Sequence, residues 1–590
     1  MKSVLSLVLG LGAPLAPLAS SAPETTAEAP RQEPDEDSLG DLKSVIDHSI
    51  RWLRSVQDLE SGRYGTGVEA TAQVLTTLAT SPRHYVLHDG PFVQRAVDYL
   101  LAHAGADGAI HDPAAGEQDK RRQTAAAARA LRAYDDERTA LAAERAEAWL
   151  ERVGAPPAEA PERPERDAAR SRATELLAKR DAEGFWEGGP DEDRALATAR
   201  ALEELGRIHE VLQPPAEPPR EARALPEAKP VDAATLESAL LRGARYLVSQ
   251  ALEPGRFGAG GRADLGITAM VVGALQSVAE PRPEDVQRAI DQGLEWIASQ
   301  QREDGSIHDG KLQNYQTCVA ILALSRAEDD AYRENVLAAR DWLIGLQSDE
   351  GEGYDPSHPY YGGVGYGGDE RPDLSNLQMA LEALAASGLE SDHVVYRRAL
   401  RFLERCQNRS ESNDVELVGE GARIESGDDG GAAYAPGDSP AGFVELEDGR
   451  KAPRSYGSMS YALLKGYVFA GVPADDPRMV ALMDWLEGHW TLDVNPGFEA
   501  SEDPGAAYQG LFYYFYTLAR ALDVAGIDRM VDGQGASHDW RAELAGRLIA
   551  MQRPNDGSWV NENAARWWEG NPVLATSYAL LALERCRARG

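Results

Sequence analysis

Hydrophobic residues recur along most of the chain with helical spacing, in pairs of segments that differ from each other. The first segment of a pair alternates charged residues with an apolar stripe at i, i+3 and i+4, as in GLEWIASQQ around Trp296. The second segment is apolar on nearly every face, as in YQTCVAILALSRA. An amphipathic helix keeps one face in solvent, whereas a helix that is apolar all round is enclosed. The pattern predicts helical hairpins, each with an outer and an inner helix.

The number of hairpins suggests how they assemble. Six pairs follow residue 233, with first helices anchored at Tyr246, Trp296, Trp342, Phe402, Trp485 and Leu548. Three or four less regular pairs precede residue 212. An open array of repeats needs polar caps at its ends, whereas six hairpins can close into a ring. We therefore predict an all-α chain, with an (α/α)6 toroid of helical hairpin repeats over residues 233–590. An additional N-terminal partial array of helical hairpins is predicted over residues 41–212.

Three segments lie outside the repeats. Residues 1–22 place an apolar run after Lys2 and end in small residues, which is typical of a secretory signal peptide. Residues 23–40, rich in Ala, Pro and Glu, are predicted to be a disordered tether, and residues 213–232 a Pro-rich linker. We expect export to the periplasm or the extracellular space. No later segment reaches transmembrane length.

Composition narrows the possible partners. The formal net charge of -36 repels nucleic acid phosphates, so nucleic acid is not an expected partner. The three cysteines are an odd number spread along a long chain, and they do not form a disulfide framework. The Gly-, Asp- and Glu-rich insertion over residues 410–454 is predicted to be a solvated loop.

The turn strings QREDGSIHDG and QRPNDGSWVNE share the spacing of a Gln, a Gly and an aromatic or branched residue. They resemble the repeats of the terpenoid cyclase and protein prenyltransferase superfamily, which includes squalene-hopene cyclases and prenyltransferase β-subunits. The similarity covers residues 233–590 well and residues 41–209 weakly. The resemblance implies the toroid fold, but one fold hosts many chemistries.

The family's catalytic motifs are only partly present. Squalene-hopene-type cyclases protonate an alkene with a DxDD motif, and the best match is RPDLSNLQ, where Asp373 keeps the first Asp. Ser375 and Asn376 replace the paired Asp residues, and a hydroxyl and an amide cannot supply that proton. Asp373 is the one catalytic candidate that the resemblance leaves. Prenyltransferase β-subunits hold zinc with Asp, Cys and His, but the corresponding helix starts SYGSMSYALL and NPVLATSYALL carry no Cys or His. We therefore expect no metal and no cofactor.

The candidate ligand site follows from toroid geometry. The inner helices of a toroid run the same way, so their N-termini meet on one rim, and the long turn before residue 373 overhangs it. Alternatively, Asp373 and Ser375 are only N-cap residues, and the aromatic side chains are ordinary core. The ligand-binding candidates are Asn314, Tyr366, Asp369, Glu370, Ser375, Asn376, Tyr456, Tyr508, Tyr513, Trp567 and Asn571.

Three functions stay open at this point. The leading hypothesis is an exported toroid that binds a small apolar or amphipathic, isoprenoid-like molecule, or a protein segment, in its cavity. The second is a non-enzymatic repeat scaffold for a protein partner. The third is a carbohydrate-active (α/α)6 enzyme, which would need two carboxyl groups across its substrate.

Overall fold

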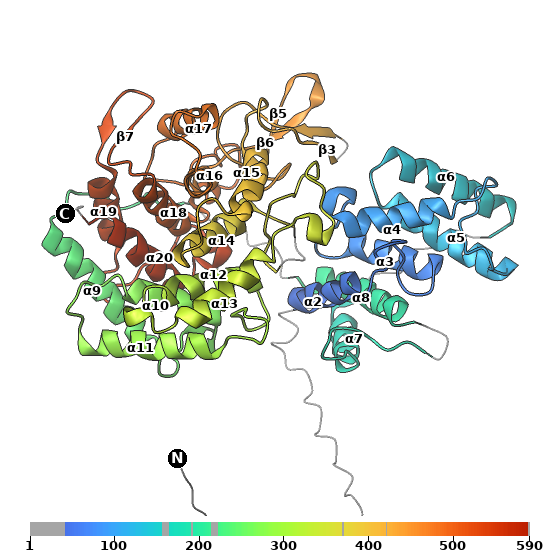
Figure 1. Cartoon of the computed structure of the whole chain (residues 1–590), viewed down its shortest axis with the longest axis horizontal. Helices are drawn as coiled ribbons and strands as arrows, with labels where there is room; N and C mark the ends of the chain where they lie inside the picture. The colour runs from blue at the N-terminus through green and yellow to red at the C-terminus, as the bar shows by residue number, and fades with distance from the viewer. Residues whose placement is uncertain are drawn as a thin grey trace, which may run out of the picture.

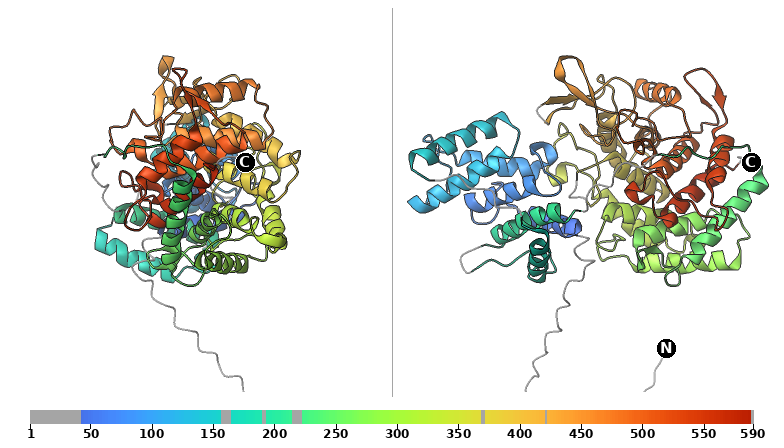
Figure 2. Two further views of the ribbon diagram at one scale, coloured as in Figure 1. Left: turned by 90° about the vertical axis from the view of Figure 1, so that its left-hand side faces the viewer. Right: turned by 180° about the vertical axis from the view of Figure 1, so that it is seen from behind.

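The structure is a computed structural model that describes residues 42–155, 164–189, 193–213, 222–367, 371–419 and 422–587. The predicted signal peptide and tether lie outside these residues, as do residues 214–221 of the predicted linker. The helices form two groups that lie side by side along the long axis (Figure 1), and the view from behind shows the same division (Figure 2).

The larger group is a closed toroid, so the predicted fold class is confirmed. Each inner helix contacts the next, and α20 contacts α10, which closes the ring. The outer helices are α9 (Ala233–Ser249), α11 (Glu284–Ser299), α13 (Arg333–Ile344), α15 (Val394–Cys406), α17 (Pro477–Gly488) and α19 (Trp540–Met551). The inner helices are α10 (Leu265–Leu275), α12 (Gln313–Leu324), α14 (Leu374–Ala386), α16 (Gly457–Phe469), α18 (Leu511–Val524) and α20 (Pro572–Arg585).

The burial of each helix explains its composition. Every residue of α10 is buried, as expected for a helix that is apolar all round. In α11, by contrast, the buried positions fall on one stripe that includes Val286, Ile290 and Ile297. Burial of apolar surface on both sides of the inner ring is therefore what holds the two rings together.

A repeated glutamine joins five of the turns to the following hairpin. Its side-chain Nε2 donates to two carbonyl groups at 2.9–3.0 Å, one in its own turn and one in the next outer helix. Gln552 donates to the carbonyl of Ala239 in α9, so the last hairpin is tied to the first. The five residues are Gln57, Gln301, Gln347, Gln407 and Gln552.

The glycine of the same turns allows this close approach. Gly362 and Gly430 have φ angles of 82° and 83°, in the left-handed region. A Cβ at either position would overlap backbone atoms of Arg398 in α15 or Ala481 in α17. The repeated Gln and Gly are thus explained by packing between hairpins.

The N-terminal group has its own hydrophobic core. Helix α3 contacts α4, α5 and α8, while α2 and α7 contact α8. The linker between the two groups is described from residue 222 onward, and this part contacts the toroid. The backbone N–H of Arg223 donates a hydrogen bond to Asn563 Oδ1 at 2.9 Å. The helices are α2 (Leu42–Ser55), α3 (Val68–Thr80), α4 (Pro91–Ala102), α5 (Glu117–Arg132), α6 (Glu137–Arg152), α7 (Arg166–Ala178) and α8 (Arg194–Leu212).

The insertion over residues 410–454 contains a small sheet, so the expectation of a solvated loop was wrong. The strands are β3 (Glu416–Gly419), β4 (Ala422–Glu425), β5 (Phe443–Glu445) and β6 (Lys451–Pro453), in the order β3-β4-β6-β5. Val415, Leu417 and Ile424 form a small core beneath it. Alternation over so few residues is hidden by the surrounding Gly and acidic residues.

Two short hairpins and several 3-10 turns complete the described residues. The hairpins are β1 (Gly258–Ala259) with β2 (Arg262–Ala263), and β7 (Met530–Val531) with β8 (Ser537–His538). The 3-10 turns are η1 (Leu87–Asp89), η2 (Glu328–Asp330), η3 (Glu350–Glu352), η4 (Glu447–Gly449), η5 (Ala506–Tyr508) and η6 (Arg566–Trp568).

Candidate functional site

Asp373 closes the first turn of α14. Its Oδ1 accepts a hydrogen bond from the backbone N–H of Asn376 at 2.8 Å, and its Oδ2 accepts one from Asn376 Nδ2 at 2.7 Å. Tyr434 also hydrogen-bonds this carboxyl group. Asp373 is 2% exposed, and burial raises its pKa to about 7 although the bonds from Asn376 oppose that shift. The residue is an N-cap whose protonated form is populated near neutral pH.

The carboxyl group of Asp373 is engaged by its own helix. A general acid must hold its proton within reach of the substrate. Both carboxyl oxygens of Asp373 instead accept hydrogen bonds from the first turn of its own helix. The adjoining positions Ser375 and Asn376 supply no second carboxyl group. The N-cap interpretation therefore accounts for the geometry of Asp373.

A hydroxyl pair links α14 to α18 beside this cap. Ser375 Oγ and Tyr513 Oη form a hydrogen bond at 2.8 Å, and Gln378 Nε2 donates to Tyr513 Oη at 3.0 Å. Ser375 and Tyr513 are half-buried, whereas Asn376 and Gln378 beside them are buried. Gln378 Oε1 is buried and has no hydrogen-bond partner among the described residues. This hydroxyl pair is an accessible polar point on the rim.

Asn314 connects α12 to the same place. Its Nδ2 donates to Asn376 Oδ1 at 3.1 Å, and its backbone N–H donates to the carbonyl of Tyr366 at 2.7 Å. Its Oδ1 accepts a hydrogen bond from Cys318 Sγ at 3.2 Å. Burial raises the pKa of the Cys318 thiol far above its usual value, so the thiolate that a metal would need is disfavoured.

The other predicted residues lie in the turns of neighbouring hairpins. Tyr456 precedes α16 and packs its ring against Phe498 with centroids 5.2 Å apart. Asn571 caps α20 by accepting from the backbone N–H of Val573. Trp567 is 42% exposed and has a φ of 56°. The carbonyl of Tyr508 accepts a hydrogen bond from Asn561 Nδ2.

The contacts thus gather part of the predicted set around the start of α14. Those residues are Asn314, Tyr366, Asp373, Ser375, Asn376 and Tyr513. Asp369 and Glu370 lie outside the described residues.

Sequence reasoning missed a buried carboxyl group on the same rim. Glu569 is 1% exposed and accepts hydrogen bonds from the backbone N–H of Tyr513 at 2.8 Å and from Asn561 Nδ2 at 2.7 Å. It therefore closes the first turn of α18 from the turn before α20. Burial raises its pKa to about 7, against the effect of these bonds. No local motif marks such a cap, because the capped helix lies 45 or more residues earlier.

A second missed group lies deeper in the ring. Lys465 of α16 and Arg520 of α18 both form ion pairs with Glu382 of α14. Burial alone would raise the pKa of Glu382, but the two cations lower it to about 2. A charge inside a core is tolerated only when it is paired in this way. The sequence places each residue in a separate helix with no signal that they meet.

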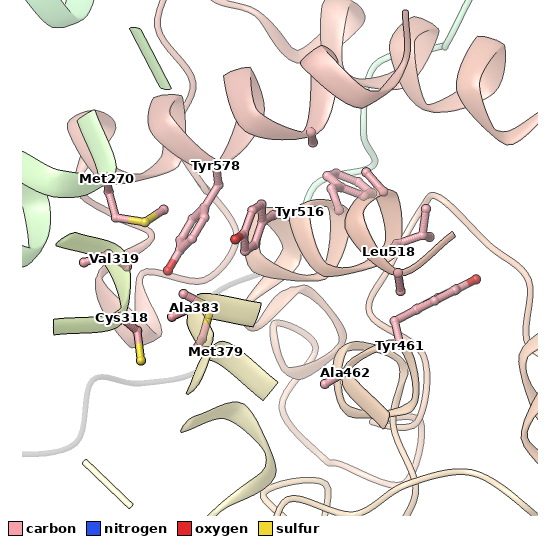
Figure 3. Packing of buried hydrophobic residues seen from close by; sticks show 14 of the residues in the cluster. Met270, Cys318, Val319, Met379, Ala383, Tyr461, Ala462, Tyr516, Leu518 and Tyr578 are labelled. Carbon is pink, nitrogen blue, oxygen red and sulfur yellow. The ribbon is translucent and has the colours of Figure 1, made fainter. Parts of the chain in front are cut away.

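Aromatic side chains occupy the space enclosed by the inner ring. The ring centroids of Tyr516 and Tyr578 are 5.6 Å apart, and those of Tyr513 and Tyr578 are 5.9 Å apart. Figure 3 shows the rings of Tyr516 and Tyr578 side by side, with the side chains of Met270 and Met379 nearby. Tyr516, Tyr578, Met270 and Met379 are all buried. Buried aromatic and methionine side chains therefore line the interior beneath the hydroxyl pair.

The long turn before α14 also contacts the N-terminal helices. Arg371 Nη2 donates to the carbonyl of Arg83 at 2.8 Å, and its Nε lies 3.6 Å from Asp89 Oδ1. Tyr360 Oη donates to the same carboxyl group at 3.3 Å. Burial raises the pKa of Asp89, while Arg371 opposes that shift. The rim and the N-terminal helices are thus joined through a buried ionic contact.

Two general features of the described ranges concern metals and membranes. No group of three or more His, Cys, Asp or Glu side chains in these ranges is arranged to hold a metal ion. None of the helices in the same ranges is both long enough and apolar enough to cross a membrane.

Comparison with known proteins gives one family match. Residues 262–419 match the squalene-hopene cyclase C-terminal domain. No curated protein matches the chain. The match runs from α10 through α15 and into the insertion that follows, and it includes Asn314, Asp373 and Ser375.

Several solved structures are distantly similar. A variant of the type II terpene cyclase MstE from Scytonema, in complex with merosterolic acid A, is 16% identical with a TM-score of 0.36, and the alignment covers 60% of this chain and 97% of that one. A protein from Actinoplanes is 15% identical, with a TM-score of 0.35 and coverage of 60% and 99%. An ent-copalyl diphosphate synthase from Streptomyces platensis is 12% identical, with a TM-score of 0.30 and coverage of 83% and 99%.

No residue role is taken from these distant structures. Two findings relate this chain to known proteins: the family match over residues 262–419 and the closed ring of helical hairpins. Together they confirm the resemblance of the C-terminal part of this chain to the terpenoid cyclase and prenyltransferase toroid superfamily.

Proposed function

We propose that the toroid binds an apolar or amphipathic, isoprenoid-like molecule at the rim of its inner helices, without class II acid chemistry and without zinc. The observation that carries this proposal is the half-buried hydroxyl pair of Ser375 and Tyr513 above a buried aromatic lining. A few polar groups beside apolar and aromatic walls suit a ligand with a polar head and an apolar tail. The match to the squalene-hopene cyclase C-terminal domain supports the same ligand class.

Two isoprenoids that differ in one hydroxyl group test the proposal. Geranylgeraniol carries a hydroxyl that can hydrogen-bond Ser375 and Tyr513, whereas squalene carries none. Native mass spectrometry of the full chain should show tighter binding of geranylgeraniol. The double variant Ser375→Ala with Tyr513→Phe should lose that preference. The control variant Tyr246→Phe, on outer helix α9, should still bind geranylgeraniol more tightly than squalene. Failure of both isoprenoids to bind would refute the proposal.

The absence of acid chemistry has its own test. Incubation of the protein with squalene should give no cyclised product, because both oxygens of Asp373 accept hydrogen bonds within α14. A cyclised product that disappears in Asp373→Asn would show that this carboxyl group still acts as the acid.

A non-enzymatic scaffold is the second candidate, and the packed tyrosines favour it. If Tyr516 and Tyr578 leave no room for a ligand, the toroid would serve as a rigid surface for a protein partner. Protein purified from its own host should then carry no small molecule in native mass spectrometry. A co-purified isoprenoid would exclude this candidate.

Export is part of the proposal and rests on residues 1–22 alone, which lie outside the described residues. N-terminal sequencing of the protein from its host should find a start beyond this segment. Retention of Met1 in the mature protein would contradict export through a cleaved signal peptide.

A further inference from the structure

A hollow of about 560 Å³ lies in the N-terminal group of helices, among residues outside the toroid. Its walls come from the end of α2 with the turn that follows it, and from the start of α8. The volume is within the range of small-molecule sites. None of its lining residues belongs to the rim described above.

An unpartnered hydrogen-bond acceptor lines this hollow. Gln57 is 6% exposed, and its Nε2 donates to the carbonyls of Gly62 at 3.0 Å and Phe92 at 2.9 Å. Its Oε1 is buried and has no partner among the described residues. In the toroid, the equivalent oxygen of Gln347 is likewise buried without a partner among the described residues, whereas that of Gln407 accepts a hydrogen bond from the hydroxyl of Tyr467 at 2.7 Å. Gln57 thus places an unsatisfied acceptor just beneath the surface of the hollow.

One wall of the hollow is apolar and flat. The indole of Trp52 is half-buried and packs against Phe185 with ring centroids 5.0 Å apart. Val56 lies on the same lining and is 40% exposed. An aromatic ring held from behind in this way offers its surface to the apolar face of a ring-shaped ligand.

The charged groups of the lining balance each other. Asp58 and Asp193 supply two carboxyl groups, while Arg63 and Arg194 supply two guanidinium groups. Hydrogen bonds from the backbone and side chain of Ser61 lower the pKa of Asp58, so it stays ionised. Asp193 already accepts hydrogen bonds from Thr66. Such a lining favours neither an anion nor a cation, but it offers donors and acceptors to a neutral molecule with several hydroxyl groups.

We propose that this hollow binds a neutral sugar ring. The apolar face of the sugar would lie on Trp52 and its hydroxyl groups would bond Asp58 and Arg63, while Gln57 Oε1, just beneath the surface, would accept a hydroxyl only after the lining side chains shift. The proposal is independent of ligand binding at the toroid rim, because the two sites share no residue.

Saturation-transfer NMR on the full chain tests the proposal with the methyl glycosides of glucose, galactose, mannose and N-acetylglucosamine. At least one should bind saturably in the millimolar range. Val56→Asp, which places a charge in the hollow, and Arg63→Gln, which removes a donor, should each weaken that binding by about tenfold or more. Circular dichroism would verify that both variants are folded.

Leu59→Asp is the matched control. Leu59 lies in the same turn, is 69% exposed and is not part of the lining, so this variant should bind like the unmodified chain. The proposal is overturned if none of the four glycosides binds. It is also overturned if both hollow variants bind normally, or if Leu59→Asp weakens binding as much as they do.

Discussion

Replacing Gln407 by Leu tests whether the repeated glutamine holds the hairpins together. Gln407 is fully buried, and its Nε2 donates to the carbonyls of Gly430 and Arg478, each at 2.9 Å. Its Oε1 accepts from the hydroxyl of Tyr467 at 2.7 Å. Leu has a similar volume, so the main effect is to leave the carbonyl of Gly430 and the hydroxyl of Tyr467 unpaired, while the carbonyl of Arg478 keeps its hydrogen bond within α17. At about 1–3 kcal/mol for each of the two groups, the substitution should cost at least about 2 kcal/mol of local stability.

Native-state hydrogen exchange measures this cost where it arises. Peptides that cover the Gly430 turn and the start of α17 should exchange about a hundredfold faster in Gln407→Leu. Gln300→Leu is the control, because Gln300 Nε2 donates only to Ser299 Oγ, at 3.0 Å, and the residue is half-buried. That variant should change exchange by less than about threefold. Equal effects of the two substitutions, or a change in Gln407→Leu of less than about fivefold, would refute the reasoning.

Further predictions concern pH, charge and metal. Because burial raises the pKa of Asp373 to about 7, its contribution to stability is lost as pH rises through about 7. Asp373→Asn, which keeps a capping side chain, should therefore reduce the dependence of the urea midpoint on pH between about pH 4 and 7, while Glu569, whose pKa is also raised to about 7, keeps part of it. An unchanged pH dependence would contradict this. Burial, with nearby cations, lowers the pKa of His358 to about 4, so the contribution of His358 to stability should fall as pH falls from about 6.5 toward 4. His358→Gln should lose less stability over that range in the same assay. Lys465→Met should cost about 3–5 kcal/mol in urea unfolding, whereas Lys465→Met combined with Glu382→Gln should recover part of the loss. Addition of EDTA should leave the unfolding midpoint unchanged, and a lowered midpoint would reveal a structural metal.

Much of the fold could be predicted because the buried face of each helix carries apolar residues at helical spacing in the sequence. The all-round apolar pattern marked α10 and α12 as inner helices, and the striped pattern marked α11 as outer. The insertion over residues 410–454 was misassigned because its strands are three or four residues long, too short for alternation to stand out. The candidate site was predicted in part. Asp373 was correctly recognised as a possible N-cap, the role that it has at the start of α14.

The sequence by itself determined the hairpin repeat, the division into outer and inner helices, and the turn glutamines. These features depend on local spacing or on the identity of single residues. The tertiary structure decided that α20 meets α10, that Glu569 caps α18 and that Lys465 and Arg520 neutralise Glu382. The spacing of apolar residues indicates that a side chain is buried, but it does not indicate which side chains surround it. The pKa of a buried carboxyl group depends on those neighbours, and here they come from helices far apart in the sequence.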